Sequence, residues 1–157
     1  MAVLLLRVVQ GRYAPVKRNV LLVAPTPELA AALVAWLAEK DFSTTHVTSF
    51  GMAKDRLMER PSLLIAEVRL GEYNGLHLAI HAHALGIPTI VIGEPDAVLQ
   101  RDAEQLGAVY LTYDLDHSDL VRVLVNLPID GPDDRRHASS PIANLTFLSR
   151  KELDRPA

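Results

Sequence analysis

The chain has 157 residues, of which 49% are hydrophobic and 22% are charged, and its net charge at pH 7 is −3. This length and composition suit one globular domain with tails, able to bury a core without disulfides or metal ions. The small negative charge gives no reason to expect a nucleic-acid partner. The absence of cysteine excludes disulfide bonds, thiolate catalysis and cysteine–zinc sites.

The sequence also contains no apolar stretch of about 18 residues, the length that crosses a membrane. The apolar start, Met1–Arg7, lacks the basic region and the cleavage pattern of a signal peptide. We therefore expect a cytoplasmic protein without membrane contact. Within residues 1–18, the run Val3–Val9 predicts a short extra strand or an ordered arm, ended by Gly11 and Pro15.

From residue 19 to residue 127, short apolar runs alternate with stretches of helical periodicity. Thr26 is expected to cap the first helix, with Pro27 at its first position, and Ser118 is expected to cap the last. In chain order, the predicted elements are strand 20–24, helix 27–40, strand 44–47, helix 52–58, strand 63–68, helix 76–85, strand 88–92, helix 97–106, strand 109–112 and helix 118–125.

Five apolar strands that alternate with five helices predict a parallel sheet covered by helices on both faces. The expected fold class is α/β, doubly wound and flavodoxin-like, with strand order 2-1-3-4-5. Ligands of such sheets bind beyond the carboxyl ends of the strands. The loops that matter for function therefore begin at Ala24, Glu67, Gly93 and Tyr113.

Residues 128–157 change in composition and form a third region. Pro, Gly, Asp, Arg and Ser dominate its first half, which predicts a polar linker. Asn144–Leu153 regains apolar side chains and is expected to form a short helix that docks on the domain or on a partner. Leu148–Leu153 is similar to the opening of a helix-turn-helix domain, but no recognition helix follows, so we expect no direct DNA binding.

The segment Glu67–Gly75 has the length and the Asn-Gly ending of a phospho-acceptor loop. The chain resembles the receiver domains of two-component response regulators over residues 19–127. The resemblance lies in the segment Glu67–Gly75 and in the runs 20–29, 86–92 and 107–112. The resemblance implies the CheY-like variant of the flavodoxin fold and a role in phosphorelay signal transduction. It also assigns Glu67 to the position of the phosphorylated aspartate.

The residues at the family's active positions depart from its pattern. Ala24 and Pro25 stand where the family has two acidic residues that hold Mg²⁺. Gly93 replaces the Ser or Thr that contacts the phosphoryl group, and Tyr113 replaces the lysine. Without metal and ammonium charges, the negative charge of an acyl phosphate lacks compensation. We therefore expect a pseudo-receiver with no Mg²⁺ or other cofactor and no aspartyl phosphorylation.

Several residues have more than one interpretation. Glu67 either imitates phospho-aspartate through its fixed charge or is an acidic strand end without that role, and we favour the latter. Tyr110 matches the family's switch aromatic, although a half-buried packing role is the simpler interpretation. His77 and His81 share one helix face at the i,i+4 spacing of a metal pair, but no third ligand is evident, so we expect exposed histidines.

The resulting hypothesis is a non-enzymatic signalling domain that acts through protein–protein contact. The resemblance places the partner surface at Ala97–Val125, where the exposed charges Arg101, Asp102, Glu104, Asp119 and Arg122 could also pair in a homodimer. Two alternatives stay open. One is an atypical phosphorelay receiver that is still phosphorylated. The other is a small-molecule sensor that uses the vacated pocket, expected to be apolar, around Ala24, Pro25 and Gly93.

Overall fold

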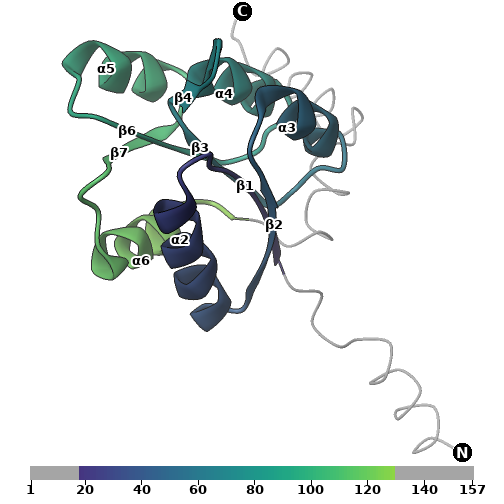
Figure 1. Ribbon diagram of the computed structural model, residues 1–157, viewed down its shortest axis with the longest axis vertical. Helices are drawn as coiled ribbons and strands as arrows, with labels where there is room; N and C mark the ends of the chain where they lie inside the picture. The colour runs from purple at the N-terminus through teal and green to yellow at the C-terminus, as the bar shows by residue number, and fades with distance from the viewer. Residues whose placement is uncertain (1–17, 130–157) are drawn as a thin grey trace, which may run out of the picture.

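A five-stranded parallel β-sheet forms the centre of the structure (Figure 1). The structure is a computed structural model, and it describes residues 18–129. The strand order is β2-β1-β3-β6-β7, which confirms the predicted 2-1-3-4-5 order. The strands are β1 (Arg18–Val23), β2 (Phe42–Val47), β3 (Leu63–Glu67), β6 (Thr89–Gly93) and β7 (Val109–Thr112).

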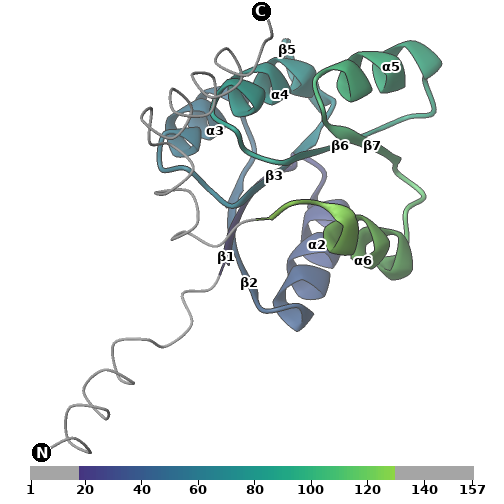
Figure 2. The same cartoon turned by 180° about the vertical axis from the view of Figure 1, so that it is seen from behind.

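Five helices cover the two faces of this sheet, as Figures 1 and 2 show from opposite sides. Two of them, α2 (Pro27–Glu39) and α6 (His117–Asn126), pack on one face. The other three, α3 (Phe50–Leu57), α4 (Gly75–Ala84) and α5 (Ala97–Gln105), pack on the opposite face. The predicted flavodoxin-like class is therefore confirmed.

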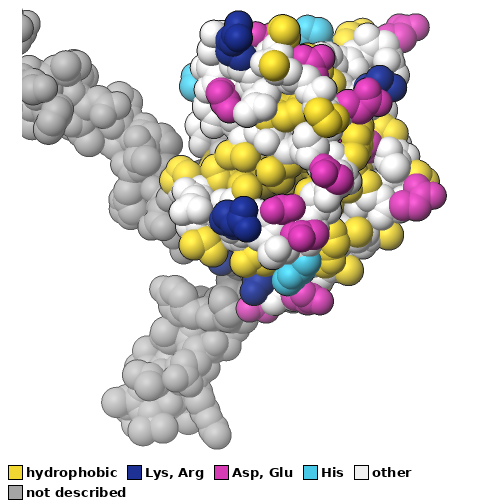
Figure 3. Space-filling view, turned by 90° about the vertical axis from the view of Figure 1, so that its left-hand side faces the viewer, with side chains coloured by type: hydrophobic (Ala, Val, Ile, Leu, Met, Phe, Trp, Pro, Cys, Tyr) yellow, Lys and Arg dark blue, Asp and Glu magenta, His cyan; other side chains and the backbone are white. Residues whose placement is uncertain are grey.

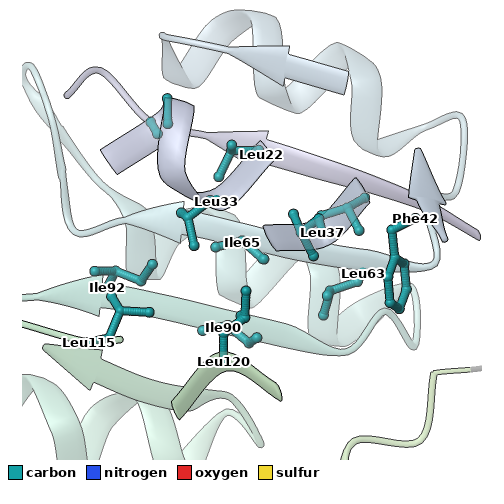
Figure 4. Packing of buried hydrophobic residues seen from close by; sticks show 13 residues of the cluster. Leu22, Leu33, Leu37, Phe42, Leu63, Ile65, Ile90, Ile92, Leu115 and Leu120 are labelled. Carbon is teal, nitrogen blue, oxygen red and sulfur yellow. The ribbon is translucent and has the colours of Figure 1, made fainter. Parts of the chain in front are cut away.

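Successive residues of a strand point to opposite faces, which explains why the central strands are apolar over most of their buried length. In β1, Val20 and Leu22 belong to the cluster under α2 and α6, whereas Leu21 and Val23 belong to the cluster under α3 and α4. Figure 4 shows the first cluster, where Leu33 of α2 lies near Ile65 of β3. Each helix is therefore held to the sheet mainly by burial of apolar side chains.

The structure corrects some predicted boundaries. Ser118 does not cap the last helix, because the carboxylate of Asp116 accepts from the backbone N–H of Asp119 at 2.9 Å. The Ser118 hydroxyl instead donates to Asp116 at 2.7 Å. The segment Glu67–Gly75, expected to be a loop, contains a small antiparallel hairpin made of β4 (Arg69–Leu70) and β5 (Tyr73–Asn74).

Other predictions concern the ends of the chain or membrane contact. The arm expected at Val3–Val9 and the helix expected at Asn144–Leu153 lie outside the described residues. Within residues 18–129, no helix is long and apolar enough to cross a membrane.

A close backbone contact fixes the loop that follows β3. The N–H of Gly75, the first residue of α4, donates to the carbonyl of Val68 at 2.7 Å. A Cβ atom at residue 75 would collide with the carbonyl oxygen of Glu67 and would lie 3.0 Å from its carbon. Glycine is needed here for close approach, and that approach sets the position of Glu67 at the carboxyl edge of the sheet.

Candidate functional site

The four loops that begin at Ala24, Glu67, Gly93 and Tyr113 meet at one edge of the sheet. The register of the strands sets this arrangement, because Val23 pairs with Ala66, Glu67 with Ile92, and Gly93 with Thr112. The structure therefore brings together the residues that the sequence placed at the carboxyl ends of the strands.

Glu67 is 3% exposed, and both of its carboxylate oxygens are hydrogen-bonded. The hydroxyl of Thr26 donates to Oε1 at 2.6 Å, and the backbone N–H of Thr26 donates to Oε2 at 2.9 Å. Thr26 is the N-cap of α2, but its side chain caps no N–H group of its own helix. The Glu67 carboxylate instead supplies negative charge at this helix start, where the helix dipole favours an anion.

Tyr113 lies on the other side of Glu67. Burial, the negative charge of Glu67 and the interaction of the phenol with that carboxylate raise the pKa of Tyr113 from 10.0 to about 12. The phenol therefore stays neutral at physiological pH. Glu67 accepts hydrogen bonds from the backbone N–H and the hydroxyl of Thr26, and it forms no ion pair with any residue of the described range 18–129.

The residues at the family's metal positions offer no side-chain ligand. Ala24 is 1% exposed, and its carbonyl oxygen lies 2.8 Å from Nε2 of His46. Pro25 is exposed and has no polar side-chain atom. Within the described part of the chain, no group of three His, Cys, Asp or Glu residues could hold a metal ion. Because Mg²⁺ needs several oxygen ligands in octahedral geometry, this donor set does not fit it.

Tyr110 occupies the space that a side chain at residue 93 would need. The Tyr110 hydroxyl donates to the carbonyl of Glu94. A Cβ atom at Gly93 would collide with this hydroxyl and would lie 2.7 Å from Cγ2 of Val68. Tyr110 is half-buried, as the packing interpretation expected. Gly93 and Tyr110 therefore form a complementary pair that leaves no room for Ser or Thr.

The pocket at this edge differs from the expected apolar crevice. A cavity of about 110 Å³ borders Gly93, but neither Ala24 nor Pro25 lines it. Its walls include Arg69, Glu94, Asp96 and Tyr113, and Arg69 and Glu94 form an ion pair of 3.2 Å. The cavity is polar and smaller than the pockets of about 300–1,000 Å³ that hold drug-sized ligands.

Sequence reasoning did not find the roles of Thr26 and His46 at the site. Thr26 was predicted only as a helix cap, and a contact across 41 residues leaves no local signal. His77 and His81 are exposed, as expected, and both rings lie 6.5 Å from the ring of Phe50.

The predicted partner surface, Ala97–Val125, consists of α5, the edge strand β7 and α6. All four residues of β7 are half-buried. In Figure 3, which faces this edge, apolar side chains gather in a band across the middle, and charged side chains lie above and below it. Val98 and Val125 are 63% and 77% exposed. The surface therefore combines an apolar strip with a polar rim, as in many protein interfaces.

Replacing Thr26 with valine tests the Thr26–Glu67 contact. Thr26→Val keeps the side-chain shape but leaves Oε1 of Glu67 without its hydroxyl donor, so we expect a loss of about 1–2 kcal/mol in the free energy of unfolding. Urea denaturation measures this loss. Thr48→Val is the matched control, since Thr48 is exposed and should tolerate the change. Equal effects of the two substitutions would contradict the contact.

The raised pKa of Tyr113 predicts a stability change at alkaline pH. The folded state binds the phenolic proton more tightly than the unfolded state, so this stabilisation is complete below pH 10 and is lost as the pH rises from 10 to about 12. The stability of the wild type relative to Tyr113→Phe should fall across that window. Denaturation of both proteins at several pH values checks this, and a constant difference would refute the assigned environment.

Comparisons with known proteins place this geometry in a known fold. No protein-family model matches the sequence, and no curated protein matches it either. Solved structures do match. A response regulator receiver domain (CheY-like) from Methylobacillus flagellatus is 20% identical, with a TM-score of 0.61 over 68% of this chain and 95% of that one. A two-component response regulator from Clostridium difficile is 17% identical, with a TM-score of 0.63 over 68% and 91%.

A third structure shows the same similarity. The CheY-like receiver domain protein from Methanospirillum hungatei is 17% identical, with a TM-score of 0.61 over 68% of this chain and 90% of that one. The three structures are covered almost completely, and the similarity is one of backbone arrangement. The described domain therefore has the fold of response regulator receiver domains.

Proposed function

We propose that this domain is a receiver-like signalling module that acts by protein–protein contact and is not switched by Mg²⁺-dependent phosphorylation. The observation that carries the proposal is the state of Glu67. Both of its oxygens accept hydrogen bonds from Thr26, and Ala24 and Pro25 have no side-chain oxygen that could hold a metal ion beside it.

Electrostatics argues in the same direction. Two unit negative charges about 4 Å apart repel by about 4 kcal/mol at an effective dielectric constant of about 20. An added phosphoryl group brings further negative charge, and no lysine lines the cavity at this edge. Arg69 does line it, but its guanidinium is already ion-paired with Glu94 at 3.2 Å. The neutral Tyr113 phenol can donate a hydrogen bond but cannot supply a positive charge.

The alternative of an atypical phosphorylated receiver requires Glu67 to attack a phosphodonor. An attacking oxygen would first have to give up its bond to the Thr26 hydroxyl or to the Thr26 N–H. It would then have to leave a site in which only 3% of the residue is exposed. These two costs make contact signalling the function that this geometry favours.

The partner surface that we propose is Ala97–Val125, which includes an apolar strip along β7. Arg101, Asp102 and Glu104 are exposed on α5 and are available for charge pairing with a partner or a second copy. Asp119 is less available than the sequence suggested. Its carboxylate accepts from the N–H of Asp116 and lies 3.7 Å from the guanidinium of Arg122. We therefore propose that α5 and β7 contribute most of the contact.

The proposal that the domain is not phosphorylated predicts no chemical modification by a small phosphodonor. After incubation with acetyl phosphate and Mg²⁺, we expect the intact mass of the protein to stay unchanged, because Glu67 has neither metal nor free oxygens. Addition of Mg²⁺ and beryllofluoride should likewise leave the NMR amide shifts around Glu67 unchanged. A phosphoryl adduct in the wild type that disappears in Glu67→Gln would overturn the proposal.

The Gly93–Tyr110 pair predicts a non-additive double mutant. Gly93→Thr should cost about 1–3 kcal/mol, because the new side chain collides with the Tyr110 phenol. The cost should be smaller in a Tyr110→Ala background, and the NMR shifts caused by Gly93→Thr alone should extend along β7 and α5. Denaturation of all four proteins in the cycle measures the coupling. An equal cost in both backgrounds would place the clash on Val68 instead.

A further inference from the structure

A second concave site lies at the end of the sheet opposite Glu67. Its volume is about 360 Å³, and it is open to solvent. Arg18 and Phe42, the first residues of β1 and β2, line it together with the C-terminal part of α6. The six residues of β1 separate it from the Thr26–Glu67 site by about 20 Å. The two sites share no residue.

One wall of this groove is apolar. It consists of Phe42 together with Val121, Leu124, Val125 and Leu127. Val125 is 77% exposed, and the other α6 residues of the wall are only half-buried. Covering this wall would remove apolar surface from water, which favours binding of an apolar group.

The other wall carries two positive charges, from Arg18 and Lys40. The Arg18 guanidinium lies 4.7 Å from the centre of the Phe42 ring. Stacking on a ring uses the flat face of a guanidinium, so the N–H donors at its edge can still bind an anion. The structure gives neither cation an ion pair with an acidic residue in the range 18–129.

The acidic residues next to Lys40 do not compensate these charges. Glu39 lies 2.9 Å from Nε2 of His117 at the start of α6, and it forms no ion pair with Lys40 or Arg18. Asp41, on the other side of Lys40, forms no ion pair with Lys40 or Arg18 in the structure. The groove thus combines an apolar wall with two cations that have no acidic partner among the described residues.

We propose that this groove binds a small amphipathic carboxylate, such as a medium-chain fatty acid. The carboxylate would bind Arg18 and Lys40, and the alkyl chain would lie between Phe42 and α6. The volume falls at the small end of the range for small-molecule pockets, about 300–1,000 Å³. The negative charge of the carboxylate complements the positive charges of Arg18 and Lys40. Residues 1–17 carry Arg and Lys but no acidic side chain, so that segment has the wrong charge to fill the site.

The test uses the full chain with dodecanoate as the probe, kept below the concentration at which it forms micelles. Dodecylammonium, with the same alkyl chain and the opposite charge, is the matched ligand control. We expect saturable binding of dodecanoate by calorimetry, with NMR shifts at Phe42, Leu124 and Val125. Dodecylammonium should bind at least tenfold more weakly.

Variants assign the two walls separately. The double variant Arg18→Gln/Lys40→Gln and the single variant Val125→Asp should each weaken dodecanoate binding at least tenfold. The control Lys54→Gln removes an exposed cation of α3 and should leave the affinity unchanged. The substituted residues of all three variants are exposed, and a circular dichroism spectrum checks that each variant is folded.

Three results would overturn the proposal. The first is no saturable binding of dodecanoate to the wild type. The second is binding that persists in both wall variants or is matched by dodecylammonium. The third is binding that appears only when Phe147→Ser and Leu148→Ser are introduced, because that result would show the C-terminal segment, and not a free carboxylate, to be the occupant.

Discussion

The two hydrogen bonds between Thr26 and Glu67 are the contact on which the geometry of the carboxyl edge depends. They join the end of β3 to the start of α2, two elements that are far apart in sequence. The contact satisfies two groups, because a nearly buried carboxylate needs hydrogen-bond donors and the N–H groups at a helix start need an acceptor. Each partner satisfies the other, and Glu67 therefore has its hydrogen-bond donors without an ion pair among residues 18–129.

Two tyrosines complete the edge on its other side and act by different physical means. Tyr113 interacts with Glu67 and remains neutral because burial and that carboxylate raise its pKa. Tyr110 acts by volume, since its phenol fills the space beside Gly93 and donates to the Glu94 carbonyl. The described edge therefore combines aromatic bulk with hydrogen-bonding groups around Glu67. This composition is what supports the proposal that the domain is not switched by phosphorylation.

The sequence predicted the fold well because the strands are governed by a strong and local signal. A strand covered on both faces is apolar at most positions, and the residues 63–66 of β3 and 90–92 of β6 follow this rule. Capping was harder to predict, because Asp116 and Ser118 both offer oxygens near one helix start and only geometry decides between them. The short pairing of β4 with β5 has too few residues to show any periodicity.

The residues of the candidate site were located from the sequence, but their contacts were not. The absence of acidic side chains at Ala24 and Pro25 can be read directly, because it depends on residue type alone. The hydrogen bonds from Thr26 to Glu67 cannot be predicted from the sequence, since any of several loops could supply donors to a carboxylate at a strand end. The fit of Tyr110 to Gly93 also escapes sequence reasoning, because it requires knowing that two strands in register bring them together.

The position of α6 connects the two ends of the molecule. Val121 and Leu124 line the groove at the amino end of the sheet, and the same helix forms one side of the Ala97–Val125 surface. A ligand in the groove therefore contacts an element that a partner would also contact. Such a ligand changes partner affinity only if it binds two arrangements of α6 with different strength. Under that condition, the shared helix α6 would connect the proposed ligand site at one end of the domain with the proposed partner contact at the other.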